Sequence, residues 1–301
     1  MESITVFTPT YNRGYILNEL YDSLKLQSSK NFIWLIIDDG SNDNTSQLVQ
    51  KWIDENIIKI KYYKQNNMGK SMAYNRAIEL ARTELFTCVD SDDSLDVKAI
   101  EEIINCYNKK VNNTIIGIIC FRFNKKSNTP ITKFNDNLCI DDTLMNLYNN
   151  RGMSGDTMLI YKTNVIKKFR FPYFNDEKFV PESYLYDLID KEGTLFVLRK
   201  YLYYGNYLND GYTHNMKKII AENPKGYEMF IKQRIKLDCN IKRRFLNSIR
   251  YIAICFVKKD SKIIKNSDYK IYSFLAYPFA KLYYNIEFKK YKNKNLGENN
   301  K

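Results

Sequence analysis

Three aspartates fall within four positions of the stretch CVDSDDSL, which begins at residue 88. Asp90, Asp92 and Asp93 directly follow the apolar run at 85–89, which predicts a buried strand. Carboxylates at the end of a strand suit a hard divalent cation such as Mg²⁺ or Mn²⁺, because such cations prefer oxygen ligands. A bound cation would neutralise a departing diphosphate. The alternative is an acidic turn in which one residue caps the following helix.

Two more polar clusters follow apolar runs in the same half of the chain. Residues 8–13 (TPTYNR) come after the first run, and residues 38–41 (DDGS) come after the second. The carboxyl ends of parallel strands meet at one edge of a sheet, and ligands bind there. The three clusters are therefore expected to converge on one rim.

The elements that would hold these clusters alternate along the first 125 residues. Continuous apolar strands separated by amphipathic helices predict an α/β fold whose mostly parallel sheet has helices on both faces. Strands are expected at 4–8, 32–37, 57–63, 85–89, 115–123, 157–161 and 195–203. Helices are expected at 15–26, 42–56, 71–82, 96–108, 141–148, 162–169, after Pro181, and beyond 216.

Four segments in order carry a family resemblance: VFTPTYNR (6–13), IIDDGSNDNT (36–45), NMGKSMAYNRAI (67–78) and VDSDD (89–93). Together they resemble the family-2 glycosyltransferases of the GT-A fold, closely over the first 125 residues and loosely to 215. The resemblance implies a Rossmann-like nucleotide-diphospho-sugar transferase. It also implies a UDP-sugar donor bound across the rim with Mn²⁺ or Mg²⁺.

The resemblance assigns roles to individual residues on this rim. Pro9 and Tyr11 would line the base, and Asp39 would accept a hydrogen bond from the uracil N3–H. Asp90 would meet the ribose, and Asp92 the metal and the phosphates. The alternative for Asp39 is a residue that merely shapes the turn.

Five further candidates are less sharply defined. Asp93 is a second candidate for the metal ligand beside Asp92, and the sequence leaves both open. Arg13, Lys70 and Arg76 are expected to border the nucleotide, although the last two could be solvated helix charges. His214 is a candidate metal ligand in a polar loop, and a surface histidine is the alternative.

Inverting transfer requires a general base that takes the proton of the acceptor hydroxyl while the sugar carbon is attacked from the opposite face. Relatives place an acidic residue, often a Glu-Asp pair, at the start of a helix that follows a loop. The corresponding stretch here, FVPES, contains Glu182 alone. Glu182 is the implied base, with Asp156 as runner-up or acceptor contact, although the helix dipole also simply stabilises a carboxylate there. Asp176 and Glu177 are expected to be loop charges.

Composition sets the broad class. Apolar residues make up 44% and aromatic residues 15% of the chain, which is enough for a packed core. No secretion signal or membrane-spanning apolar run is found.

Six scattered cysteines without a CxxC pair are expected to be small buried hydrophobes in a reducing compartment. A single histidine excludes any site that needs two imidazoles. The expected location is the cytoplasm.

Charge is distributed unevenly along the sequence. Residues 1–100 carry 11 Lys and Arg against 14 Asp and Glu, residues 101–210 carry 15 against 13, and residues 211–301 carry 21 against 7. The net charges are therefore −3, +2 and +14. We expect a catalytic domain over 1–215, with a nucleotide-binding half (1–125) and an acceptor half (126–215), followed by a basic helical region over 216–301.

Basic and aromatic residues interleave at 241–259 and 269–294. The first segment places Phe245, Ile249, Ile252 and Phe256 at helical spacing. Such a helix could pack its apolar stripe on the catalytic domain. It could also bind nucleic acid, but no known binding motif accompanies it. The composition best suits a helix that lies in an anionic membrane surface.

The resemblance thus implies an inverting, metal-dependent transfer of a sugar from a UDP-sugar to a glycan acceptor, and the acidic rim is consistent with it. A lipid-linked acceptor at the inner face of a bacterial plasma membrane is expected, in capsule, O-antigen or similar surface-polysaccharide synthesis. One alternative is a transferase that acts on a soluble or protein acceptor. Another is a non-catalytic scaffold partner, which the missing second acidic residue beside Glu182 favours.

Overall fold

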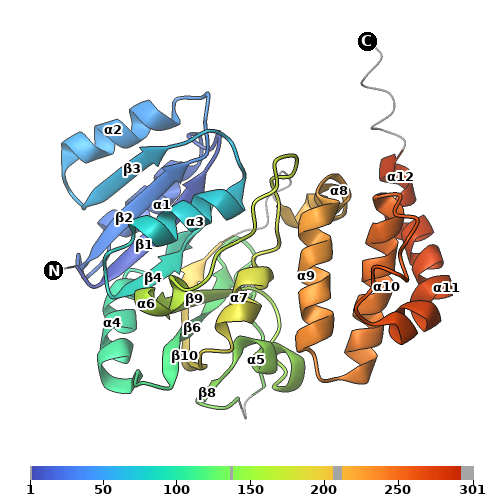
Figure 1. The fold of residues 1–301 in the computed structure, drawn as a ribbon. Helices are drawn as coiled ribbons and strands as arrows, with labels where there is room; N and C mark the ends of the chain where they lie inside the picture. The colour runs from blue at the N-terminus through green and yellow to red at the C-terminus, as the bar shows by residue number, and fades with distance from the viewer. Residues whose placement is uncertain (1, 136–137, 206–211, 293–301) are drawn as a thin grey trace. The chain divides into compact units, whose positions relative to one another are not determined.

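The computed structural model describes residues 2–135, 138–205 and 212–292 (Figure 1). The chain divides into two compact units. The first comprises Met1–Phe171 and Leu185–Asn206, and the second comprises Pro172–Tyr184 and Tyr207–Lys301. This division differs from the predicted boundary at 215, because a short internal segment groups with the C-terminal helices.

The first unit is built on one mixed sheet with strand order β3-β2-β1-β4-β9-β6-β10-β5. The strands are β1 (Ile4–Thr10), β2 (Phe32–Asp38), β3 (Ile60–Lys64), β4 (Leu85–Cys88), β5 (Ser94–Leu95), β6 (Ile115–Asn124), β7 (Thr129–Pro130), β8 (Asp141–Asp142), β9 (Thr157–Lys162) and β10 (Thr194–Tyr204). The pairs β3–β2, β2–β1, β1–β4 and β6–β10 are parallel, whereas β9 runs antiparallel between β4 and β6. The predicted α/β fold is confirmed. Pairing is parallel from β3 to β4 and between β6 and β10, and the other pairs of the sheet are antiparallel.

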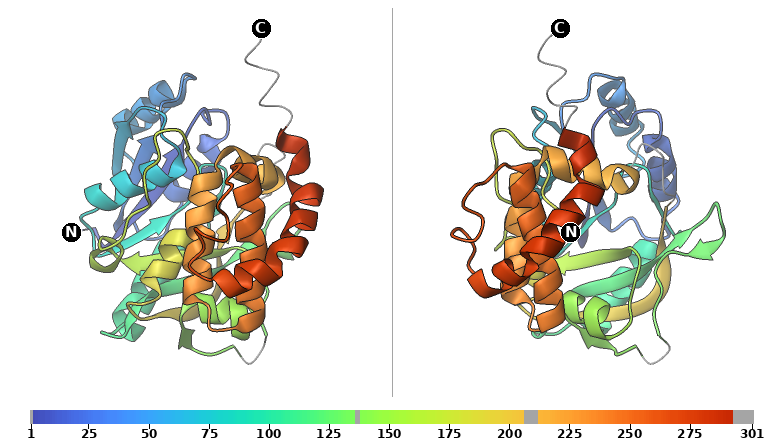
Figure 2. Two further views of the ribbon diagram at one scale, coloured as in Figure 1. Left: turned by 45° about the vertical axis from the view of Figure 1, so that its right-hand side comes forward. Right: turned by 90° about the vertical axis from the view of Figure 1, so that its right-hand side faces the viewer.

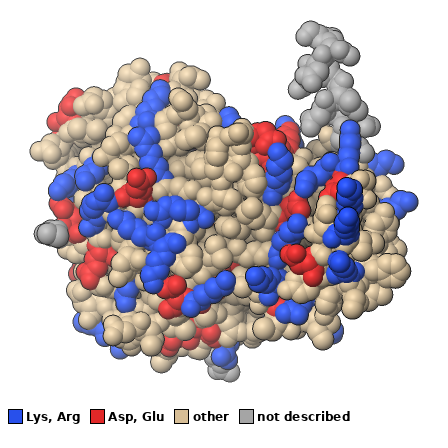
Figure 3. All heavy atoms as spheres, viewed as in Figure 1, with Lys and Arg blue, Asp and Glu red and all other residues tan. Residues whose placement is uncertain are grey.

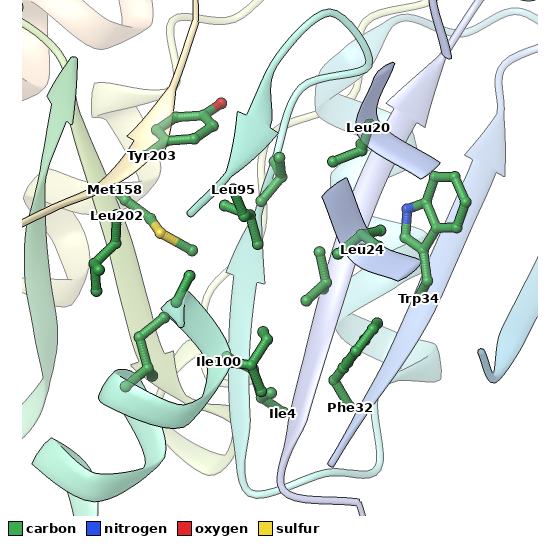
Figure 4. Close-up of a cluster of buried hydrophobic side chains, with 14 of the residues drawn as sticks. Ile4, Leu20, Leu24, Phe32, Trp34, Leu95, Ile100, Met158, Leu202 and Tyr203 are labelled. Atoms are coloured by element: carbon green, nitrogen blue, oxygen red, sulfur yellow. The ribbon is translucent and has the colours of Figure 1, made fainter. Parts of the chain in front are cut away.

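Helices cover both faces of this sheet. They are α1 (Leu17–Lys25), α2 (Thr45–Glu55), α3 (Lys70–Leu80), α4 (Ala99–Lys110), α5 (Leu144–Asn150), α6 (Thr163–Ile166) and α7 (Ser183–Ile189). On one face α1, α2 and α4 share an apolar core with the strands, and part of this core is drawn in Figure 4. On the other face α3 sets Tyr74 against Phe7, with ring centroids 5.2 Å apart. Burial on both faces explains why β2, with the sequence FIWLIID, is apolar almost throughout.

The expected elements recur with small shifts at their ends. The helix expected at 141–148 instead begins at Leu144, after the two-residue strand β8. Thr143 is its N-cap, and its side-chain oxygen accepts a hydrogen bond from Asn146 N at 3.3 Å. The carboxylate of Asp190 accepts hydrogen bonds from Leu144 N at 2.9 Å and Met145 N at 2.6 Å. These long-range contacts fix where the helix starts, and local sequence pattern does not contain them.

The second unit is helical. It contains α8 (Tyr212–Glu222), α9 (Pro224–Leu237), α10 (Ile241–Val257), α11 (Lys270–Glu287) and α12 (Lys289–Lys292). α10 packs against both α9 and α11. The apolar stripe predicted on α10 lies within this packing, with Ile252 fully buried and Phe245, Ile249 and Phe256 partly buried. The stripe is therefore covered by neighbouring helices and is not a free membrane-binding face.

The segment Pro172–Tyr184 is tied to the helical unit by hydrogen bonds. Asn223 Oδ1 accepts from Lys178 N at 2.8 Å and from Phe179 N at 3.1 Å. Glu177 accepts from Lys225 N at 2.9 Å and from Gly226 N at 2.8 Å, in the first turn of α9. Glu177 was expected to be a loop charge, but it is a buried cap at a helix N-terminus.

Two expectations from composition can be compared with the structure. No helix among the described residues is both long enough and apolar enough to cross a membrane. All six cysteines are free thiols, of which Cys106, Cys120 and Cys255 are buried. Cys239 is exposed, which contradicts the expectation that the cysteines are buried hydrophobes.

Candidate functional site

The three polar clusters meet at one edge of the sheet, as predicted. β1 lies between β2 and β4 and runs parallel to both. As the chain leaves β2, Asp39 N donates to Thr10 O at 2.8 Å, and as it leaves β4, Val89 N donates to Phe7 O at 2.8 Å. The loops that follow β1, β2 and β4 therefore begin side by side at the carboxyl ends of these strands.

The two aspartates at the end of β2, Asp38 within the strand and Asp39 just after it, hold loops in place. Asp38 is buried and accepts from Ser41 N at 2.7 Å and from the Tyr62 hydroxyl at 2.5 Å. Asp39 accepts from Met68 N at 3.0 Å and Gly69 N at 2.7 Å. Asp39 thus holds the loop that leads into α3. Its predicted contact with uracil stays a prediction.

An ion pair joins α3 to the first aspartate of the acidic loop. Lys70, the first residue of α3, places Nζ 2.6 Å from Asp90 Oδ1. Burial opposes ionisation of Asp90, but the charges of Lys70, Arg122 and Arg13 outweigh it and hold the pKa below its usual value. Lys70 is therefore not simply a solvated helix charge, because it faces the rim and neutralises Asp90.

Asp92 has the least satisfied carboxylate of the acidic loop. It is half-buried, and no other described residue donates a hydrogen bond to its carboxylate. Burial raises the pKa of Asp92, and the negative charge of Asp90 raises it further, while Arg13 and Lys70 act in the opposite direction. A cation beside Asp92 would relieve both effects, so the surroundings of Asp92 fit a metal ligand.

Asp93 is engaged on both carboxylate oxygens. Arg122 Nη2 lies 2.6 Å from its Oδ1, and the Tyr203 hydroxyl donates to its Oδ2. The side chains of Asp93 and Arg122 are only 1% and 12% exposed. Burial and the charges of Asp90 and Asp92 raise the pKa of Asp93, against the opposing charge of Arg122.

Arg122 and Tyr203 were missed in the sequence and are central to this arrangement. The Arg122 guanidinium lies 4.9 Å from the centre of the Tyr203 ring, and its Nη1 lies 3.3 Å from Asp156 Oδ2. Arg122 therefore links the acidic loop after β4 to Asp156, which directly precedes β9. The available signal was a single arginine near the end of the apolar run IIGIICFRFN. A Cβ atom on Gly205 would collide with both Asp93 and Arg122.

The remaining nucleotide-site candidates occupy the same unit. Pro9 is a half-buried residue of β1, and Tyr11 is exposed just beyond that strand. Arg13 is half-buried and donates to the Tyr15 hydroxyl at 2.5 Å. Arg76 donates to the backbone carbonyl of Lys64 at 3.0 Å and lies over the Tyr63 ring, so it is held against β3.

Glu182 and His214 lie beside and in helices, whereas Asp156, the other candidate for the base, directly precedes β9. Glu182 is half-buried and directly precedes α7, which agrees with the predicted helix start. It belongs to the second unit, whereas Asp156 belongs to the first. His214 falls in the first turn of α8, where a polar loop was expected, and its side chain lies outside the described residues.

The side chains available as metal ligands decide which kind of metal site is possible. Among the described residues, no three His, Cys, Asp or Glu side chains group as a complete protein-built metal site. Mg²⁺ does not need such a group, because it is commonly held by one or two carboxylates together with substrate phosphates. Asp92, with Asp90 two residues away on the same loop, fits that second arrangement.

The fold and the acidic rim are those of an α/β protein of the GT-A type. Residues 5–170 match the family described as glycosyl transferase family 2. This match covers more than half of the 301 residues, and the chain belongs to that family.

Individual relatives extend this assignment. The chain is 32% identical over 120 residues to the poly(ribitol-phosphate) beta-N-acetylglucosaminyltransferase TarP of Staphylococcus aureus, which covers 38% of this chain and 36% of TarP. It is 23% identical over 232 residues to the GalNAc(5)-diNAcBac-PP-undecaprenol beta-1,3-glucosyltransferase of Campylobacter jejuni, covering 75% of this chain and 72% of that protein. The chain spans about a third to somewhat over half of the length of the curated relatives that it matches first.

A solved structure supports the fold independently. The crystal structure of S. aureus TarS 1-349 in complex with UDP-GlcNAc superposes with a TM-score of 0.58 at 18% identity, covering 91% of this chain and 79% of that chain. At that identity the likeness confirms the predicted GT-A fold.

Proposed function

We propose that this protein transfers a sugar from a UDP-sugar to a glycan acceptor in bacterial surface-polysaccharide synthesis, with a divalent cation as cofactor. The observation that carries the proposal is the acidic loop after β4. Asp90 is paired with Lys70 and Asp93 with Arg122, whereas Asp92 receives no hydrogen bond from another described residue. Family membership and the named relatives supply the reaction class.

Within this proposal Asp92 is the main protein ligand of Mn²⁺ or Mg²⁺, and His214 stays a second candidate. A bound cation supplies positive charge that stabilises the leaving diphosphate. Asp93 was an equal candidate from sequence. Because Arg122 and Tyr203 already engage both of its oxygens, we assign Asp93 the role of fixing the loop that presents Asp92.

The nucleotide would lie across the carboxyl ends of β1, β2 and β4. Pro9 and Tyr11 would contact the base, and the half-exposed Tyr11 ring is available for such a contact. Asp39 would accept from uracil N3–H, and Asp90 would contact the ribose. Arg13, Lys70 and Arg76 would border the nucleotide and its phosphates. UDP as the nucleotide is supported by the TarS complex, whose description names UDP-GlcNAc.

Inversion of the sugar carbon is the proposed stereochemical outcome. The names of both relatives specify beta-linked products. A UDP-hexose commonly carries its sugar in the α configuration, so attack from the opposite face yields a β product. Glu182 is the proposed base that takes the acceptor's proton, and Asp156 is the runner-up.

The Glu182→Gln variant is expected to lower kcat for sugar transfer by about 100-fold or more while UDP binding stays unchanged, because glutamine keeps the size but cannot take a proton. Asp156→Asn is the matched comparison. If Asp156→Asn has the large effect and Glu182→Gln has none, Asp156 is the base instead. Product configuration, determined by NMR, tests inversion separately, since a retained configuration would contradict both assignments.

The acceptor is proposed to be lipid-linked, with the protein peripherally associated with the inner face of the plasma membrane. The Campylobacter relative is named for a glycan on PP-undecaprenol, which supports this choice. A soluble or protein acceptor is the alternative. A non-catalytic scaffold is a further one, and it predicts UDP binding without turnover of any donor.

The experiment that tests the proposed function is UDP release from a panel of UDP-sugars, with Mn²⁺ or Mg²⁺ and again with EDTA. We expect slow hydrolysis of one donor that EDTA abolishes and that added metal restores. UDP binding is measured in parallel by calorimetry. Failure of UDP to bind in the presence of metal would overturn the rim site.

A further inference from the structure

Helix α11 exposes a row of large apolar side chains. Six of its residues are between 55% and 77% exposed: Ile271, Phe274, Leu275, Phe279, Leu282 and Ile286. We call this set the α11 face. Soluble proteins seldom leave so many neighbouring apolar groups in water, and contiguous exposed apolar patches mark interaction sites.

The α11 face is a continuous stripe. A helix turns 100° per residue, so the six positions fall within an arc of about 140°. The opposite side carries Ser273, Ala276 and Ala280, which are buried. The two alanines belong to the apolar core that α10 shares with α9 and α11. The helix therefore packs on the unit through small residues and directs its large apolar residues outward.

Cations accompany the α11 face. Lys270 and Lys281 are exposed residues of α11, and Lys289 and Lys290 are exposed residues of α12. The surrounding sequence, 211–301, has 21 Lys and Arg against 7 Asp and Glu. Figure 3 shows Lys and Arg side chains beside uncharged surface over the helices of the second unit, and Figure 2 turns α11 toward the viewer.

We propose that the α11 face is a membrane-binding surface that lies in an anionic lipid bilayer at the level of the headgroups. The six apolar side chains would enter the boundary of the acyl chains, and the lysines would meet lipid phosphates. The inference rests on the proposed function for the reason why this protein visits a membrane. Its physical basis, an outward apolar stripe beside an excess of cations, is separate from the transfer reaction.

A bilayer explains this face better than a second copy of the chain. A helix that pairs with another helix through a coiled-coil seam needs a narrower apolar stripe than an arc of 140°, whereas a flat surface contacts a wide one. Dimerisation through this face would also bring two strongly basic surfaces together, at an electrostatic cost. An anionic lipid surface has the complementary charge.

The test is sedimentation of the full chain with vesicles of phosphatidylcholine that contain phosphatidylglycerol. The double variant Phe274→Gln/Leu282→Gln removes two members of the α11 face. The matched control, Leu26→Gln/Ile140→Gln, replaces two residues of the first unit that are 69% and 67% exposed. We expect the α11 variant to bind about tenfold more weakly or worse, because each lost side chain forfeits apolar burial. The control is expected to bind as the parent protein does.

Salt dependence, vesicles without anionic lipid, the oligomeric state and UDP release decide between the outcomes. Parent binding that weakens with salt and is lost on pure phosphatidylcholine supports the anionic surface, and an equal loss in both double variants overturns the assignment to α11. A parent protein that does not bind anionic vesicles overturns the proposal. A parent dimer that becomes a monomer in the α11 variant, without vesicle binding, assigns the face to a second copy. UDP release without acceptor should be the same in all these proteins, so failure of the membrane proposal is distinguishable from failure of the transfer proposal.

Discussion

Replacement of Asp92 by Asn is expected to lower kcat for sugar transfer by about 100-fold or more, because it removes a charge that acts on the leaving group through the cation. The change should leave the fold intact. No other described residue donates a hydrogen bond to the Asp92 carboxylate, so its replacement by an amide of the same shape breaks no hydrogen bond with another described residue. Transfer rates at saturating donor over a range of Mn²⁺ concentrations would measure the effect.

Two comparisons make the Asp92→Asn experiment decisive. Asp54→Asn, which alters an exposed carboxylate on α2, should leave both the rate and the metal dependence unchanged. The metal concentration for half-maximal rate should rise in Asp92→Asn alone. Full activity of Asp92→Asn with an unchanged metal requirement would contradict the assignment of Asp92 as the metal ligand.

The helices and strands of the first unit were predictable because each shows its own pattern of apolar residues over a short stretch of sequence. β2 is buried on both faces, so its apolar residues are continuous, and α1 shows its buried face through Leu17, Leu20 and Leu24. The order of β9, β6 and β10 was not predictable in this way. Their pairing depends on contacts between residues far apart in the sequence, such as Gly117 with Tyr161. The grouping of Pro172–Tyr184 with the helical unit has the same cause.

The acidic rim was predictable because loops after parallel strands share an edge. The separate roles of Asp92 and Asp93 were not, because Arg122 and Tyr203 lie 29 and 110 positions away from Asp93. The same limit applies to the basic helices. α10 and α11 are both amphipathic with aromatic residues, and only the packing shows that the stripe of α10 is covered while that of α11 is exposed.

Among the substitutions proposed for this protein, replacement of Arg122 is expected to lower the free energy of unfolding the most. In the Arg122→Met variant the Asp93 carboxylate, whose side chain is 1% exposed, keeps the Tyr203 hydroxyl but loses its cation. Removing one partner of a buried ion pair costs about 3–5 kcal/mol. The buried Asp93 carboxyl must then either stay charged without a cation or take up a proton, and the raised pKa of Asp93 favours uptake of the proton. Unfolding in guanidinium chloride, followed by circular dichroism, would measure this loss.

Two further variants show whether the fall in stability comes from the broken ion pair or only from removing a large side chain. Arg151→Met breaks an ion pair with Asp142 at 3.0 Å, but Arg151 is 51% exposed, so little change in stability is expected. The double variant Arg122→Met/Asp93→Asn also replaces the carboxyl that has lost its cation, and it should recover part of the lost free energy of unfolding. If the double variant is less stable than Arg122→Met alone, Asp93 stabilises the loop through contacts other than this pair. Because Asp93 and Asp92 are adjacent, recovery of stability without recovery of transfer would show that Arg122 also keeps Asp92 in position for catalysis.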